Sequence, residues 1–179
     1  MTIELLCKVM FPPKEPVESR RVEEFSEIEQ ELGTTMPSDF KEYINLFGTG
    51  YIGRFLWVFN PFSNEESLNF IEQMEIRLDA LEEIKEKYGD DECPYPLYPE
   101  PSGLLPWGAT DNGDVLYWST VGQPDEWTVV INESRGPKFE QYEESMTGFL
   151  AKLISGDIAS KIIPYDFLDR DALFVPVQV

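Results

Sequence analysis

Residues 105–118 (LPWGATDNGDVLYW) place two aspartates, Asp111 and Asp114, on either side of Asn112-Gly113 and between two tryptophan-containing apolar runs. Acidic loops can bind calcium, but an EF-hand loop needs oxygen ligands at alternate positions and a distal bidentate glutamate. Here the apolar sequence VLYW follows instead. Asn-Gly between strand-like runs is a strong signal for a tight hairpin, because both residues tolerate positive φ. The motif therefore predicts a hairpin turn that binds no metal.

The chain contains no histidine, and this absence removes most of the familiar catalytic arrangements. Ser-His-Asp and Cys-His sites, histidine-ligated zinc and a histidine general base all require that side chain. The only cysteines, Cys7 and Cys93, are too few for a zinc framework, and we expect both to be reduced thiols. Because 34 residues are Asp or Glu, no particular carboxylate pair of the glycosidase kind can be singled out. We therefore expect a protein without catalytic residues, metal or cofactor.

Four tryptophans, Trp57, Trp107, Trp118 and Trp127, are of a type that can stack on bases or sugars. All four lie in strand-like runs, so packing in a core is the favoured interpretation. Lys and Arg total 14 against 34 Asp and Glu, which gives a net charge of 14 − 34 = −20. This balance disfavours direct binding to nucleic acid or to an anionic membrane. Two interpretations remain open: a merely well-solvated surface, or a protein whose partner is basic.

The chain length predicts one domain over residues 1–179. The first ten residues lack the basic region and the small-residue cleavage site of a signal peptide. No run of about 18 apolar residues is present to form a transmembrane helix. We therefore expect a globular protein in the cytoplasm.

Apolar spacing predicts helices over residues 22–32 and 37–47, with glycines after each of them. The aromatic and β-branched run 52–59 predicts one core strand. Ser63 and Glu66 have the spacing of a capping box, which predicts a long helix that begins there and ends near Tyr88. The predicted buried side of this helix carries Leu68, Ile71, Leu78, Leu81 and Ile84, and its solvent side carries Glu82, Glu83 and Glu86.

The four prolines of residues 90–102 (DDECPYPLYPEPS) exclude regular structure and predict an exposed acidic loop. The spacing of Pro96 and Pro99 also occurs in polyproline ligands of SH3-type domains, but the pattern is short and common. Four strand-like runs follow at 104–107, 115–118, 127–132 and 138–142, then a helix over 146–156 and a mixed tail. We therefore predict an α+β fold in which an antiparallel β-meander packs against several helices.

Two stretches resemble the SUKH superfamily, which includes the Smi/Knr-type cell-wall-assembly regulators of fungi and many bacterial immunity proteins. The first, Ile28–Gly50, has a helix, Leu-Gly, a turn before proline and a second helix that ends in a glycine pair. Met36 stands there where the family usually has leucine. The second, Leu105–Gly156, has a Pro-Trp-Gly strand, the Asn-Gly-Asp hairpin, the Trp127 strand and a closing helix. The resemblance covers most of residues 20–156; the acidic loop 90–102 and the C-terminal extension 157–179 are less typical.

This resemblance implies an α+β fold without a catalytic constellation. Bacterial members are implied to bind and neutralise a cognate toxin, often a nuclease, whereas fungal members are regulatory scaffolds. A charge of −20 suits an inhibitor that covers a basic, nucleic-acid-binding surface. We therefore predict a non-enzymatic immunity protein with a basic toxin domain as its partner. The alternative is a Smi/Knr-like regulatory scaffold, and the oligomeric state is left open.

The hypothesised partner-binding surface is the acidic loop with a nearby turn. Exposed loops on a rigid scaffold often carry recognition, and tyrosines can anchor a partner that carboxylates steer. The residues of this predicted surface are Asp90, Asp91, Glu92, Tyr95, Tyr98, Asp125 and Glu126. The competing interpretation is a solvated connection, and the long helix around Glu82, Glu83 and Glu86 is the next candidate surface.

Overall fold

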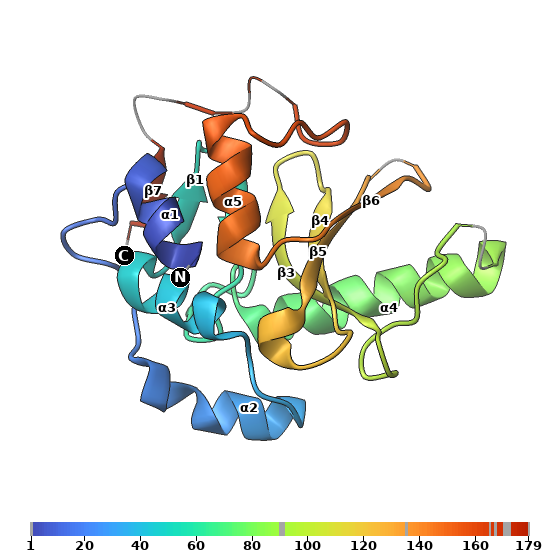
Figure 1. The fold of residues 1–179 in the computed structure, drawn as a ribbon. Helices are drawn as coiled ribbons and strands as arrows, with labels where there is room; N and C mark the ends of the chain where they lie inside the picture. Colours follow the sequence, from blue (N-terminus) through green and yellow to red (C-terminus); the bar gives the residue numbers. More distant parts are fainter. Residues whose placement is uncertain are drawn as a thin grey trace.

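The structure, a computed structural model, describes residues 2–89, 92–134, 136–164, 166, 168–169 and 173–178. Within these residues, five α-helices surround a seven-stranded antiparallel sheet with the order β6-β5-β4-β3-β2-β1-β7 (Figure 1). The α-helices are α1 (Thr2–Val9), α2 (Ser26–Leu32), α3 (Ser38–Phe47), α4 (Phe70–Tyr88) and α5 (Met146–Ser155). The strands are β1 (Gly50–Ile52), β2 (Leu56–Val58), β3 (Leu104–Thr110), β4 (Val115–Ser119), β5 (Thr128–Asn132), β6 (Phe139–Tyr142) and β7 (Phe174–Pro176). Two 3₁₀ turns, η1 (Val22–Phe25) and η2 (Pro124–Glu126), complete the set, and the predicted α+β class is confirmed.

The predicted meander is confirmed, because β3, β4, β5 and β6 follow one another as antiparallel neighbours. A register shift between Pro106 and Gly108 interrupts the pairing of β3 with β4, as in a β-bulge. A Cβ atom on Gly108 would lie 2.7 Å from the carbonyl oxygen of Trp57 on β2. The glycine of the Pro-Trp-Gly sequence therefore allows β2 and β3 to approach closely, because a larger residue would not fit there.

Both faces of the meander are covered, so β3 and β4 are buried along their whole length. Alternate residues point to opposite faces of a strand, and on β4 they enter different cores: Leu116 and Trp118 join the larger one, and Val115 and Tyr117 the smaller. Helices α1, α3 and α5 pack over the larger core, which the start of α4 also enters through Phe70, whereas the rest of α4 and the 92–102 segment cover the smaller one (Figure 1).

Residues 52–59 do not form the single strand that their composition predicts. Gly53 and Arg54 both have positive φ, 59° and 57°, and the backbone N–H of Phe55 donates to the carbonyl oxygen of Ile52 at 3.1 Å. This turn divides the run into the short strands β1 and β2, which pair with each other. The aromatic residues on both sides of a single glycine concealed the turn in the sequence.

The long helix α4 begins at Phe70, not at the predicted cap Ser63. The side chain of Asn69 accepts hydrogen bonds from the backbone N–H groups of Ile71 and Glu72 at 3.0 and 3.3 Å, as an N-cap residue does. Ser63 instead accepts from the N–H of Glu65 within the turns that precede the helix. The expected burial of Ile84 is also wrong, because 41% of this residue is exposed.

Two elements are present that the sequence pattern did not reveal. Helix α1 buries Ile3 and Leu6 and packs along α5. Strand β7, in the segment read as a mixed tail, pairs with β1 at the edge of the sheet, with Val175 opposite Tyr51. The N-terminal and C-terminal segments are thus parts of the same layered fold.

Candidate partner-binding surface

The acidic motif at residues 111–114 forms a hairpin turn between β3 and β4. Gly113 has φ of 88°, and its backbone N–H donates to the carbonyl oxygen of Thr110 at 2.8 Å. The N–H of Thr110 donates to the carbonyl oxygen of Asp114 at 2.9 Å. This is the three-residue hairpin connection in which a glycine of positive φ follows a tight turn. The prediction of a hairpin is confirmed.

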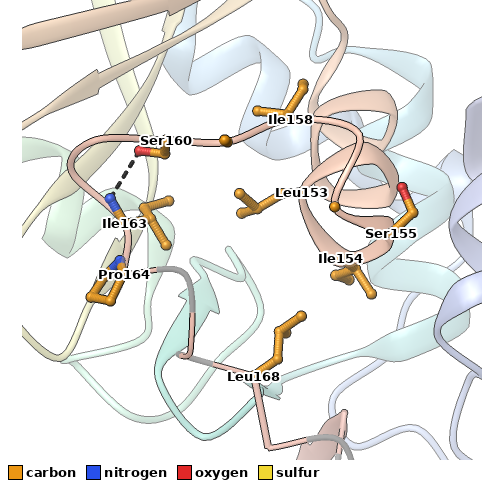
Figure 2. A pocket seen from close by; sticks show the side chains of 10 residues that line it. Leu153, Ile154, Ser155, Ile158, Ser160, Ile163, Pro164 and Leu168 are labelled. Atoms are coloured by element: carbon orange, nitrogen blue, oxygen red, sulfur yellow. Dashed lines mark hydrogen bonds between the residues drawn. The ribbon is translucent and has the colours of Figure 1, made fainter.

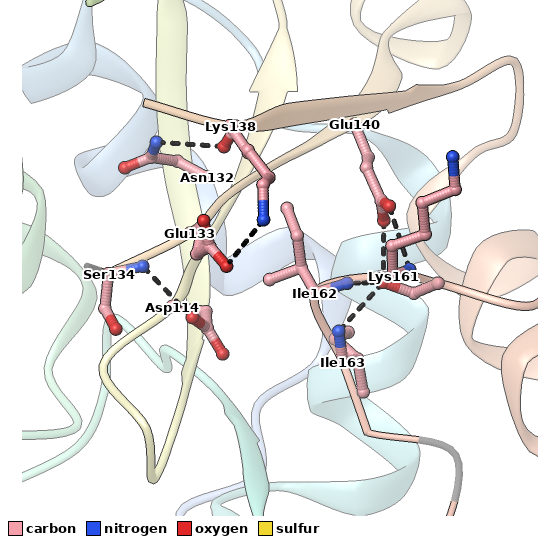
Figure 3. Close-up of polar contacts among 10 residues, drawn as sticks. Asp114, Asn132, Glu133, Ser134, Lys138, Glu140, Lys161, Ile162 and Ile163 are labelled. Atoms are coloured by element: carbon pink, nitrogen blue, oxygen red, sulfur yellow. Dashed lines mark hydrogen bonds and ion pairs between the residues drawn. The ribbon is translucent and has the colours of Figure 1, made fainter. Parts of the chain in front are cut away.

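The carboxylate of Asp114 is buried and joins two turns of the sheet (Figure 3). One oxygen accepts from the hydroxyl of Thr110 at 2.8 Å, and the other accepts from the backbone N–H of Ser134 at 3.1 Å. The hydroxyl of Ser134 in turn donates to the carbonyl oxygen of Asn112 at 2.8 Å. The motif therefore has a structural role, and the described residues contain no group of three or more His, Cys, Asp or Glu placed to hold a metal ion.

A second polar cluster surrounds Glu140 on β6 (Figure 3). This carboxylate accepts from the hydroxyls of Ser160 and Tyr142, each at 2.7 Å, and from the backbone N–H of Lys161 at 2.8 Å. Partial burial alone would raise the pKa of Glu140, but these hydrogen bonds outweigh it and lower the pKa. Burial and the bond to Glu140 raise the pKa of Tyr142 to about 12. The cluster attaches the chain after α5 to the sheet and provides no base suited to neutral pH.

A pocket of about 260 Å³ lies between the end of α5 and residues 158–160, 163–164 and 168 (Figure 2). Leucine, isoleucine and proline form most of its described lining, and its polar side chains, Ser155 and Ser160, are both hydrogen-bonded within the fold. Its volume is below the range of about 300 to 1,000 Å³ that is usual for small-molecule sites. The lining offers no paired nucleophile and base, so this pocket is not a candidate active site.

The structure places the predicted loop against the smaller core of the sheet. Cys93 and Leu97 are buried there, and the half-buried Tyr95 packs on Phe139 with ring centroids 5.2 Å apart. The hydroxyl of Tyr98 donates to the carbonyl oxygen of Leu32 at the end of α2. The loop is therefore less exposed than predicted, and its tyrosines already have partners within the protein. Asp90 and Asp91 lie outside the described residues, and Glu92 is half-buried.

The other predicted contact residues, Asp125 and Glu126, lie in η2 and are exposed. The carboxylate of Asp125 accepts from the backbone N–H of Ser38, the first residue of α3, at 2.7 Å. Glu126 accepts from the backbone N–H of Gln123 at 2.8 Å. The N–H and hydroxyl of Thr120 both donate to the carbonyl oxygen of Gly103, which brings this segment beside the 92–102 loop. The carboxylates and tyrosines of the predicted surface therefore also hold the fold together.

The solvent side of α4 is the other acidic surface that the sequence indicated. Glu82, Glu83 and Glu86 are exposed there, as predicted. The Nζ atom of Lys85 donates to the carbonyl oxygen of Tyr95 at 2.9 Å, so the helix and the 92–102 loop are in contact. Among the described helices, none is long and apolar enough to span a bilayer.

Comparison with known proteins connects this geometry to a family. Residues 22–150 match the family model described as SMI1-KNR4 cell-wall, SUKH_6, which spans α2, α3, α4, the whole meander and the first half of α5. The curated proteins and the solved structures gave no match to the chain. The match covers well over half of the 179 residues; it contains the first stretch that carries the resemblance and residues 105–150 of the second. The chain therefore belongs to the SMI1-KNR4 family of the SUKH superfamily.

Proposed function

We propose that this protein is a non-enzymatic binding protein that neutralises a basic bacterial toxin domain, most simply a nuclease, by covering its nucleic-acid-binding surface. The observation that carries the proposal is the net charge of −20 on a member of the SUKH superfamily. A nuclease must present cations to the phosphate backbone, so an acidic protein is complementary to the surface that it has to block. Charge complementarity also accelerates association, which favours an inhibitor that must act before its toxin does.

The acid–base chemistry of the described residues supports a role in binding. The carboxylates whose pKa clearly departs from its ordinary value are Glu18, Glu24 and Glu140, and all three shifts are downward. A general base or acid that works near neutral pH usually has a carboxylate pKa raised towards 7. The carboxylates with shifted pKa values in the described part of the chain are therefore tuned as hydrogen-bond acceptors.

The proposal is tested by first searching the genes beside this one for a large secreted protein with a basic C-terminal domain, and then expressing the chain in cells that also produce that domain. We expect growth to be rescued, and the two purified proteins to form a complex that eliminates nuclease activity. The proposal is wrong if no neighbouring gene encodes a basic cytotoxic domain, or if growth is not rescued. Purified chain is also expected to show no turnover of ester, phosphoester or glycoside substrates.

A regulatory scaffold is the second candidate, because the description of the matching family model refers to SMI1-KNR4 and the cell wall. It predicts the opposite outcome in the same experiment. Cells would gain no protection from the neighbouring toxin domain, and deletion of the gene would change cell-wall integrity in the absence of any toxin.

A further inference from the structure

The solvent face of α4 carries an acidic ridge. Its carboxylates recur three or four residues apart, which places them along one side of a helix. They are all exposed, and none forms an ion pair with another described residue; the six are Glu72, Glu75, Asp79, Glu82, Glu83 and Glu86.

An apolar row begins beside this ridge at Ile76. Ile76, Ala80, Ile84 and Tyr88 are each four residues apart and follow one another along the helix. Each step of four residues turns about 40° round the axis, so the row winds away from the ridge toward Tyr88 at the exposed end of the helix. Ile76 is 54% exposed, Ile84 41% and Tyr88 59%. These three account for three of the eight large exposed hydrophobic residues of the described chain. Such a concentration on one helix marks a surface that another molecule can cover.

The acidic ridge is unfavourable for the free protein. Like charges three and four residues apart on a helix repel each other. Glu86 also lies in the last turn of α4, where the helix dipole disfavours negative charge. A cationic partner would remove both penalties. The outer surface of α4 therefore has a lower electrostatic free energy in a complex with a cationic partner than in the free protein.

We propose that the solvent face of α4 is the docking surface for the basic partner, which places apolar side chains on the row Ile76–Tyr88 and lysines or arginines on the acidic ridge. This inference rests on the proposed function for the identity of the partner. In Figure 1 the C-terminal turns of α4 extend past the strands, so the end of this face is open to approach. Tyr88 is the anchor, because it is more exposed than the half-buried Tyr95 and Tyr98 of the neighbouring loop.

The chemistry of the face excludes a second copy of this chain and an anionic partner. The basic side chains of α4 are few: Lys85 donates to Tyr95, Arg77 is half-buried and donates to Gln73, and Lys87 lies over the ring of Tyr88 at 4.9 Å. Two such faces would repel each other. Cations on the partner would steer the encounter, and the apolar contacts would set the rate of dissociation.

The first test uses a short synthetic helical peptide as the probe, with leucine at every fourth position between lysines, and a version with glutamates in place of the lysines. We expect amide chemical shifts to change along α4 with the lysine peptide and not with the glutamate peptide. Shift changes centred on residues 92–102 or on η2 would overturn the proposal, as would equal binding of both peptides.

Matched triple variants separate this face from the overall charge. Glu82→Gln, Glu83→Gln and Glu86→Gln together should weaken binding of the lysine peptide about tenfold at low salt. The control Glu23→Gln, Glu27→Gln and Glu31→Gln removes the same charge from exposed residues of η1 and α2, and it should weaken binding less than about twofold. The α4 triple should also raise the melting temperature of the free protein. Equal loss of binding in the two triples would show that only net charge matters.

The apolar row has its own control. Tyr88→Ala and Ile84→Ala should each weaken binding about tenfold at high salt as well as at low salt, without lowering the melting temperature. Val121→Ala truncates a residue that is 57% exposed between β4 and η2, and it should leave binding unchanged. Unchanged binding in Tyr88→Ala would remove the apolar row from the docking surface.

The same α4 variants distinguish this proposal from the proposed function. If the chain rescues cells from the neighbouring toxin and the α4 variants associate with that toxin as fast as the wild type, the docking face is wrong and the function stands. If the lysine peptide binds α4 as expected but no rescue occurs, the face stands and toxin neutralisation is wrong.

Discussion

At the scale of single residues, the acidic side chains of this protein divide into those that hold the fold together and those that face solvent. Asp114, Glu18 and Glu140 accept hydrogen bonds from segments far apart in the sequence. The carboxylates on the outside of α4 have no such partners among the described residues. Residue type alone does not separate the two groups, and hydrogen bonding does.

Gly113→Val tests the hairpin at the same scale. Gly113 has φ of 88°, and a Cβ atom there would lie 3.3 Å from the Cβ atom of Ser134. A β-branched residue is strained in this conformation, so we expect a loss of about 1 to 3 kcal/mol in the free energy of unfolding by urea denaturation. Gly113→Asn is the control, because asparagine tolerates positive φ better, and it should lose less. Equal midpoints for wild type and Gly113→Val would contradict the turn.

The lowered pKa of Glu18 leads to a prediction of how stability depends on pH. Partial burial would raise its pKa, but hydrogen bonds from the backbone of Asn64 and from Thr49, Ser63 and the side chain of Asn64 outweigh burial and lower the pKa. A carboxylate with a folded pKa below its unfolded value of about 4.3 stabilises the fold above that value. This contribution disappears as the pH falls through the folded pKa. The difference in unfolding free energy between wild type and Glu18→Gln should therefore shrink as the pH is lowered from about 6 to about 3.

Glu27→Gln is the control for Glu18, since it removes a charge from the exposed side of α2 without removing those hydrogen bonds. Its acid unfolding curve should stay parallel to that of the wild type. A difference between Glu18→Gln and wild type that is constant over this pH range would show that the carboxylate charge contributes nothing to the network.

At the scale of elements, the two sides of α4 have opposite effects on stability. Its inner face buries Phe70 in the larger core and Leu81 in the smaller one, whereas its outer face carries repelling carboxylates. Each like-charged pair three or four residues apart destabilises a helix by about 0.2 to 0.5 kcal/mol. The N-terminal cap at Asn69 and the contacts with the sheet must offset that cost.

Asn69→Ala should therefore destabilise the folded protein. It removes the acceptor for the N–H groups of Ile71 and Glu72, and also the donor to the carbonyl oxygen of Ser63 at 2.9 Å. Loss of an N-cap lowers the free energy of unfolding by about 0.5 to 2 kcal/mol, measurable by urea denaturation. Asn69→Asp keeps the acceptor and should lose less. Two variants of equal stability would mean that the cap is not what begins α4.

At the scale of the whole molecule, the net charge of −20 acts against the compact state. Charges that repel across the surface are screened once the Debye length falls to about 10 Å, which happens near 0.1 M salt. The same screening weakens attraction to a basic partner. Salt should therefore have opposite effects on folding and on binding in this protein.

The urea midpoint should rise when sodium chloride is increased from about 0.01 M to about 0.2 M. The α4 triple Glu82→Gln, Glu83→Gln and Glu86→Gln should show a higher midpoint at low salt and a smaller rise. Urea is suitable here because it is uncharged. A midpoint independent of salt would show that self-repulsion does not limit stability.

The amino-acid sequence by itself determined the α+β class, the order of the meander strands, the Asn-Gly hairpin and the family. Each of these rests on a signal contained in a few neighbouring residues: apolar runs between turn residues, glycine at a turn of positive φ, or a motif of fixed spacing. Local signals of this kind do not depend on what packs against them, so they can be read without the fold.

Only the tertiary structure decided where β1 and β7 pair, that α1 packs on α5, and which acidic surface is unpartnered. Tyr51 and Val175 meet across more than a hundred residues of chain, and strands of three residues have no periodicity to read. Ile84 fits the apolar pattern of α4 and is nevertheless 41% exposed. Helical spacing shows which residues share a face, but the neighbouring elements determine whether that face is buried against the sheet or open to a partner.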